Sequence, residues 1–117
     1  GCYQWSPADT GQVVHCDATD WAGIIFLTPD APPRTGTWLL KHKGTGKRYR
    51  DEGLDDCFEG NQRQFDVHPF EVIDDIGNVY NRLILSNGRH LHTAGSYFGE
   101  GIDGSRLYQV FFFNEKK

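Results

Sequence analysis

The sequence contains no methionine, only three cysteines and no long hydrophobic run. Its longest apolar stretches, 23–27 and 110–113, are far shorter than the roughly 20 residues of a membrane-spanning helix, so we expect no membrane partner. The missing methionine, absent even at position 1, is what a mature chain shows after signal-peptide removal. We therefore predict a secreted protein.

The cysteines, Cys2, Cys16 and Cys57, form no C-x-x-C pair, which argues against a zinc or thioredoxin-like motif. Widely spaced cysteines in small extracellular domains usually cross-link. Three cysteines allow one internal disulfide, either Cys16–Cys57 or Cys2 with either of the others, and the sequence does not choose. A Cys16–Cys57 bond would stabilise the fold by about 3–4 kcal/mol in the chain-entropy model. A cytosolic protein with inert thiols is the alternative.

The composition is that of one globular domain spanning residues 1–117, with 38% hydrophobic and 14% aromatic residues and no linker or repeat. Residues 21–27 fit either a strand or one short helix. The last predicted strand, Arg106–Phe113, is apolar on both faces and is expected to be central in its sheet. Further strands are predicted at Val13–Cys16, Thr37–His42 and Arg63–Val67.

A β-hairpin is the strongest local signal. Asn78–Ser86 and Arg89–Thr93 flank Asn87-Gly88, the preferred pair for a two-residue type I′ turn. In that register His92 pairs with Leu83 and shares its face, whereas Arg82 points to the other face. We predict an α+β fold that is mainly antiparallel β, with a curved sheet, at most one short helix and a disulfide.

A basic segment precedes an acidic one in the middle of the chain. The basic segment contains five cations and one aromatic residue, namely Lys41, Lys43, Lys47, Arg48, Tyr49 and Arg50. It is followed by Asp51, Glu52, Asp55, Asp56 and Glu59. Such a segment can bind phosphates or an acidic partner, with Tyr49 stacking on a base, or it can be a solvated hairpin tip.

Two histidines, His90 and His92, lie two apart on a predicted strand and would share a face. A pair of this kind can bind a metal ion, but no third ligand stands at matching spacing, and Glu71 and Asp66 are unplaced. We therefore predict two surface or half-buried histidines, with no metal and no cofactor.

Glu71, Arg82 and His92 are the components of a different chemistry. A carboxylate base, a cation and an imidazole acid are what transfer of an RNA phosphodiester to its own 2′-hydroxyl requires. The segments around them, Phe70–Ile73, Gly77–Tyr80, Arg82–Leu85 and His92–Ser96, resemble the ordered motifs of small guanyl-specific fungal ribonucleases. That resemblance implies a ribonuclease-like fold, with Glu71, Arg82 and His92 catalytic and Tyr49 assisting.

Three other segments resemble the ribonuclease-like secreted effectors of cereal powdery mildews. They are Val14–Asp17, Arg63–Val67 and Leu83–Asn87. In this alignment Gln64 stands at the position of the base, and an amide does not accept the proton, so the resemblance implies an inactive enzyme. It also implies a host protein, such as an immune receptor, as partner.

We therefore predict a secreted, monomeric fungal effector, a pseudo-ribonuclease that binds RNA or a host protein. The alternatives are an active metal-free endoribonuclease that uses Glu71, Arg82 and His92, and a carbohydrate-binding or other recognition β-domain. In the last, Trp5, Trp21 or Trp38 would stack on sugar, unless all three belong to the core.

Overall fold

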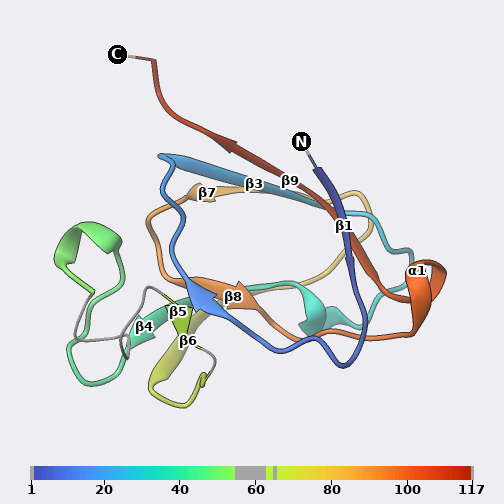
Figure 1. The fold of residues 1–117 in the computed structure, drawn as a ribbon, viewed down its shortest axis with the longest axis horizontal. Coiled ribbons are helices and arrows are strands. Elements are labelled where there is room, and N and C mark those ends of the chain that lie inside the picture. Colours follow the sequence, from blue (N-terminus) through green and yellow to red (C-terminus); the bar gives the residue numbers. More distant parts are fainter. Residues whose placement is uncertain (1, 55–62, 65, 117) are drawn as a thin grey trace.

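Two antiparallel sheets face each other in the computed structural model, which describes residues 2–54, 63–64 and 66–116 (Figure 1). Sheet A has the order β1 (Cys2–Ser6), β9 (Arg106–Phe113), β3 (Trp21–Phe26) and β7 (Leu83–Asn87). Sheet B has the order β5 (Arg63–Gln64), β2 (Val14–His15), β8 (His92–Ala94), β4 (Thr37–His42) and β6 (Phe70–Ile76). The described helical turns are short: 3-10 turns at Pro33–Thr35 and Arg50–Glu52, and α1 at Gly101–Gly104.

The chain passes repeatedly from one sheet to the other. Strands β1 to β4 alternate between sheets A and B, and β6 to β9 alternate in the reverse sense, with β5 added at one edge. Two facing four-stranded sheets in this order form a jelly roll. This topology brings the early strand β2 beside the late strand β8, where His15 lies opposite His92.

The hydrophobic cluster lies on sheet B and beneath the connection from β4 to β6. It consists of Val14, Leu40, Leu54, Phe70 and Leu91, all at most 5% exposed. Leu54 comes from the connection itself and covers the sheet. The space between the sheets is filled only in part, by Phe26, Ile84 and Tyr108.

The predicted class, mainly antiparallel β with at most one short helix, is confirmed. Strands β4 and β9 have the predicted bounds, residues 21–26 form a strand, and β9 is central, between β1 and β3. The prediction of one curved sheet is wrong, because the strands divide between two sheets. The ribonuclease-like arrangement, a sheet packed on a helix, is not supported by these layers.

The predicted hairpin at Asn87-Gly88 is also wrong. β7 pairs with β3 in sheet A, whereas β8 pairs with β2 and β4 in sheet B, so the turn moves the chain between the sheets. Neither residue has the positive φ that a type I′ turn needs. Instead, the Asn87 side chain accepts the N–H of Arg89 at 2.9 Å, and Gly88 lies directly against the backbone of Thr19.

No disulfide joins Cys2 to Cys16. Cys2 is exposed on the edge strand β1, and Cys16 is half-buried after β2. Cys57 lies outside the described residues, so the pairings that involve it stay predictions. No helix among the described residues is long and apolar enough to cross a membrane.

Gly88→Ala is expected to destabilise the fold, because a Cβ there would lie 2.3 Å from the Thr19 carbonyl oxygen. Overpacking of this kind costs about 1–3 kcal/mol. Gly11→Ala is the control, since a Cβ at Gly11 meets no atom within 4 Å. Urea unfolding of both variants measures the difference. Equal stability of the two would show that the crossing at Gly88 is not closely packed.

Candidate metal centre

A cavity of about 410 Å³ lies between the two sheets. Sheet A contributes side chains of β1, β3, β7 and β9, and sheet B contributes side chains of β2, β4 and β8. Most of its wall is apolar, as is usual for ligand pockets, but a few polar groups converge on it. His15, Asp17, His92, Thr93 and Arg106 are among them.

Three of these groups bring their donor atoms together. His15 ends β2, Asp17 follows it by two residues, and His92 begins β8 directly opposite His15. The two imidazole rings lie 4.3 Å apart. The Asp17 carboxylate lies near both rings, 3.6 Å from Nε2 of His15 and 3.2 Å from Nε2 of His92. One ligand atom from each residue lies within 4.8 Å of the other two.

Backbone carbonyls fix the orientation of both imidazoles. Nδ1 of His15 lies 2.9 Å from the Val13 carbonyl oxygen, and Nδ1 of His92 lies 2.7 Å from that of His90. A carbonyl oxygen only accepts hydrogen bonds, so each Nδ1 carries a hydrogen and donates. When the imidazoles are neutral, each Nε2 therefore presents a lone pair toward the Asp17 carboxylate. Such a group of donors requires a positive charge, either a proton or a metal cation.

The neighbouring histidines affect the pKa of Asp17. Burial by itself raises the pKa of this carboxyl, but the hydrogen bond from His92 and the charges of His92 and His15 outweigh it. The net result is a pKa below the ordinary value of 3.8. Asp17 is thus held as a carboxylate, the form that binds metal ions.

The spacing of the three donors suits one metal ion. Ligand atoms at about 2.1 Å from a shared ion, and roughly at right or tetrahedral angles, are about 3.0–3.4 Å apart. Nε2 of His92 lies 3.2 Å from one oxygen of Asp17, Nε2 of His15 lies 3.6 Å from the other oxygen, and one ligand atom from each residue lies within 4.8 Å of the other two, which is close to this spacing. The hydrogen bond from Nδ1 of each histidine to a carbonyl is the usual outer-shell support of a histidine ligand.

A buried cation forms a second polar feature of the cavity. Arg106 is 2% exposed and donates from Nε and one terminal nitrogen to the carbonyls of Thr35 and Gly36, at 2.7 and 3.1 Å. Its guanidinium lies 4.4 Å from the centre of the Tyr108 ring and 5.5 Å from that of Tyr97. Burial lowers the pKa of Arg106. No carboxylate among the described residues forms an ion pair with it.

Thr93 adds an unsatisfied hydroxyl to the same cavity. It is 1% exposed, and its Oγ1 has no hydrogen-bond partner in the described part of the chain. A buried guanidinium without a carboxylate and a buried hydroxyl without a partner are both costly, and an anionic ligand would satisfy both.

The three residues predicted as catalytic do not form one site. Glu71, on β6, forms an ion pair with Lys41 at 3.1 Å, and Arg82 donates to the Gly77 carbonyl at 3.1 Å. His92 contacts Asp17 instead. No hydrogen bond or ion pair joins any two of Glu71, Arg82 and His92, all of which the structure describes.

The residues that the sequence suggested as metal ligands beside His92 have other partners in the structure. Asp66 binds the exposed His68 at 2.7 Å, and His90 lies outside β8 and contacts the Tyr49 ring at 4.7 Å between ring centres. The sequence reasoning missed the spacing His15-x-Asp17, because these residues lie far along the chain from His92. A search for a H-x-D pair at the end of a strand would have found them.

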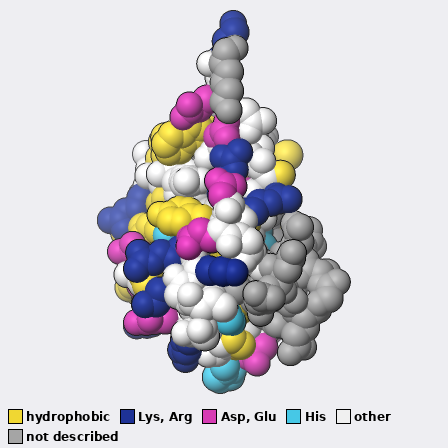
Figure 2. Space-filling model, turned by 90° about the vertical axis from the view of Figure 1, so that its left-hand side faces the viewer, with side chains coloured by type: hydrophobic (Ala, Val, Ile, Leu, Met, Phe, Trp, Pro, Cys, Tyr) yellow, Lys and Arg dark blue, Asp and Glu magenta, His cyan; other side chains and the backbone are white. Residues whose placement is uncertain are grey.

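The basic segment is largely exposed beside η2, the turn at Arg50–Glu52. Lys43, Arg48, Tyr49 and Arg50 are exposed, whereas Lys47 donates to the Gly53 carbonyl at 2.7 Å. Seen from this side, Lys and Arg side chains alternate with acidic ones and form no uniform patch (Figure 2). RNA binding by this segment stays a prediction. Gln64 lies in β5, opposite Val14.

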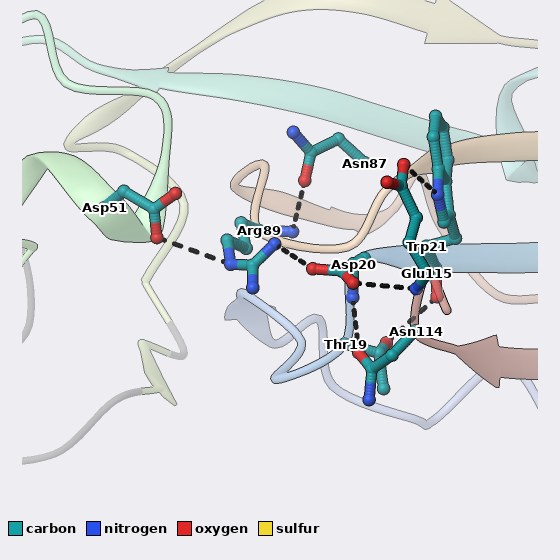
Figure 3. Close-up of polar contacts among 8 residues, drawn as sticks. All are labelled: Thr19, Asp20, Trp21, Asp51, Asn87, Arg89, Asn114 and Glu115. Carbon is teal, nitrogen blue, oxygen red and sulfur yellow. Dashed lines mark hydrogen bonds and ion pairs between the residues drawn. The ribbon is translucent and has the colours of Figure 1, made fainter. Parts of the chain in front are cut away.

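The three tryptophans do not share one surface. Trp5 is 47% exposed on β1, whereas Trp38 packs against the hydrophobic cluster on sheet B. Trp21 donates from Nε1 to Glu115, beside the pair of Asp20 and Arg89 (Figure 3). Sugar binding also stays a prediction.

Asp17→Asn is expected to remove a contribution to stability that depends on pH. Because the folded-state pKa of Asp17 lies below its ordinary value, this contribution is present above that value and is lost as the pH falls through the folded-state pKa. The gap in unfolding free energy between wild type and variant should therefore shrink as the pH falls from above 3.8 through the folded-state pKa. Urea unfolding with a chelator present measures it, with the exposed Asp9→Asn as control. A difference in unfolding free energy that does not change with pH would contradict the lowered pKa of Asp17.

Comparison of this chain with protein-family models, with curated proteins and with solved structures found no match.

Proposed function

We propose that this protein is a mononuclear non-haem iron oxygenase that uses a 2-oxo acid as co-substrate. One observation carries the proposal. The donor atoms of His15, Asp17 and His92 converge on the wall of a cavity that also contains the buried cation Arg106, for which the described residues offer no carboxylate.

The choice of metal follows from the donor set. Two imidazoles and one carboxylate, with open positions toward a cavity, are the ligands typical of non-haem Fe(II) oxygenases. Zn(II) accepts the same ligands in hydrolytic enzymes, so the donors alone do not exclude it. The buried cation in the same cavity favours iron, because an oxygenase of this kind also has to bind an anionic co-substrate.

The choice of co-substrate follows from electron balance. Insertion of one oxygen atom from O2 into a C–H bond requires two further electrons. A 2-oxo acid supplies them: R–H, O2 and the 2-oxo acid give R–OH, CO2 and a carboxylic acid one carbon shorter. One oxygen atom enters R–OH and the other enters the new carboxylate. A second carboxylate on the 2-oxo acid would pair with Arg106, so the proposed co-substrate is a 2-oxo diacid, and 2-oxoglutarate serves as the representative to test.

The residues of the chain have separate roles in this proposal. His15, Asp17 and His92 hold the iron, and the carbonyls of Val13 and His90 keep the imidazoles in the required tautomer. Arg106 binds the far carboxylate of the co-substrate, and the Thr93 hydroxyl donates to the same ligand.

The ribonuclease-like effector is a separate expectation, based on motif order and on the basic segment. The fungal source, secretion and an immune-receptor partner stay predictions. The oxygenase proposal depends on none of them.

His92→Ala and Asp17→Asn are expected to weaken Co(II) binding by about 100-fold or more, because each removes one of three protein ligands. Calorimetric titration and the visible absorption of bound Co(II) measure the change. His68→Ala is a matched control, since His68 is exposed, pairs with Asp66 and does not line the cavity. No binding by the wild type, or equal binding by His92→Ala, would contradict the metal centre.

Iron is distinguished from zinc by turnover. With Fe(II) and O2, the wild type should release CO2 from 2-oxoglutarate slowly even without a second substrate, and His92→Ala should not. Metal binding without any release of CO2 would contradict the oxygenase proposal.

Arg106→Lys and Thr93→Val are expected to weaken binding of 2-oxoglutarate by about tenfold each, which corresponds to the loss of one charge-assisted or buried hydrogen bond. Binding of pyruvate, which lacks the second carboxylate, should change little in Arg106→Lys. Calorimetry on the Co(II)-loaded protein measures both.

Thr93→Val also has an expected effect on the ligand-free protein, whose stability should stay equal or rise, since the variant removes an unsatisfied hydroxyl. For the binding measurements on Arg106→Lys, the control is Arg34→Lys, because Arg34 is an exposed cation that pairs with Asp75. Unchanged binding of 2-oxoglutarate by Arg106→Lys would show that the carboxylate binds elsewhere.

A further inference from the structure

The strand residues on the outer side of sheet A form an apolar surface, and Glu115 places a carboxylate at its edge, beside Trp21. Along a strand, successive side chains point to opposite sides. Ile24, Ile84 and Tyr108 line the cavity, so their neighbours in sequence point away from it. The outward residues include Tyr3, Trp5, Leu83, Leu85, Phe111 and Phe113, which we call the apolar face.

The register of the strands makes this face continuous. Leu85 lies opposite Gly23, which in turn lies opposite Phe111. Gly23 has no side chain, so the Phe111 ring lies over it, and a Cβ there would be 3.6 Å from that ring. In the next row, Leu83, Ile25, Gln109 and Tyr3 follow one another across all four strands.

These side chains are far more exposed than is usual for their type. Tyr3 is 70% exposed, Leu83 60%, Leu85 55%, Trp5 47% and Phe113 46%. Sheet B differs, because its hydrophobic cluster is covered by the connection from β4 to β6. In Figure 1 sheet A forms the upper layer, and only the two ends of the chain extend beyond it.

We propose that the apolar face is the interface with a second copy of this chain. Large aromatic side chains bury about 150–250 Å² each, so the exposed part of this face is of the order of 500 Å² before neighbours are counted. That is as large as the largest patch on a typical monomer, and it approaches the roughly 800 Å² per partner of a stable complex.

The near absence of charge favours a second copy over a charged partner. Two identical faces that carry charge only at one edge meet with little electrostatic repulsion, and homodimer interfaces are the more apolar class. Sheets that pack face to face lie about 10 Å apart, with their outward side chains interdigitated. The cavity lies on the opposite side of sheet A, so the dimer leaves the metal centre accessible, and this proposal does not depend on the proposed activity.

The test is the mass of the full chain in solution. Sedimentation equilibrium should give a dimer for the wild type and a monomer for the double variant Leu83→Arg, Leu85→Arg, which introduces two charges into each face. Val79→Arg is the matched control, because Val79 is 49% exposed but lies outside sheet A, and it should remain a dimer.

Circular dichroism and Co(II) binding show whether the double variant is still folded, which is expected because both leucines are more than half exposed. If it does not fold, the single variant Tyr3→Arg at the edge strand takes its place and should weaken the dimer. A monomeric wild type at high protein concentration, or a dimer in every variant, would overturn the proposal. A monomer that binds the apolar dye ANS would also overturn it, and would indicate a different occupant of the face.

Discussion

The contact between β2 and β8 is the constraint on which the account of this protein depends. It places two imidazoles next to each other and close to one carboxylate, with both Nδ1 atoms already donating to backbone carbonyls. The three remaining donor atoms are all electron-rich and face one another. A positive charge among them would stabilise the group, and either a proton on a ring or a bound metal ion would supply it.

The jelly roll is what produces this contact. Because the strands alternate between sheets, residues near the beginning of the chain lie beside residues near its end, and both border the space between the layers. The same arrangement brings Arg106, at the start of β9, into that space. The proposed metal centre and the cation proposed to bind an anion therefore share one cavity. Their residues come from β2, β8 and β9, of which only β8 and β9 are consecutive in the chain.

Local sequence patterns predicted the strands much better than the way they assemble. The apolar segment Arg106–Phe113 predicted the bounds of β9, because an apolar run reflects burial directly, and Thr37–His42 was predicted with the bounds of β4. Asn87-Gly88 misled the prediction. Its local turn preference was overridden by pairing of β7 with β3, and Gly88 serves for close approach to Thr19 rather than for a positive φ.

The site was less predictable than the strands. His92 was singled out, but with Glu71 and Arg82, which contact Lys41 and Gly77 instead. His15 and Asp17 were quoted only within a resemblance, because nothing local shows that β2 lies beside β8. Arg106 was predicted only as the first residue of an apolar strand, and its significance comes from its surroundings in the fold, where the described residues give it carbonyls and aromatic rings but no carboxylate.

The most direct test is a crystal structure of the chain with Mn(II), as a redox-stable substitute for Fe(II), and 2-oxoglutarate, with anomalous scattering recorded for the metal. The account predicts one anomalous peak bound by Nε2 of His15, Nε2 of His92 and the Asp17 carboxylate. It also predicts the far carboxylate of 2-oxoglutarate on Arg106. A cavity without metal, or a metal peak away from these three residues, would contradict it.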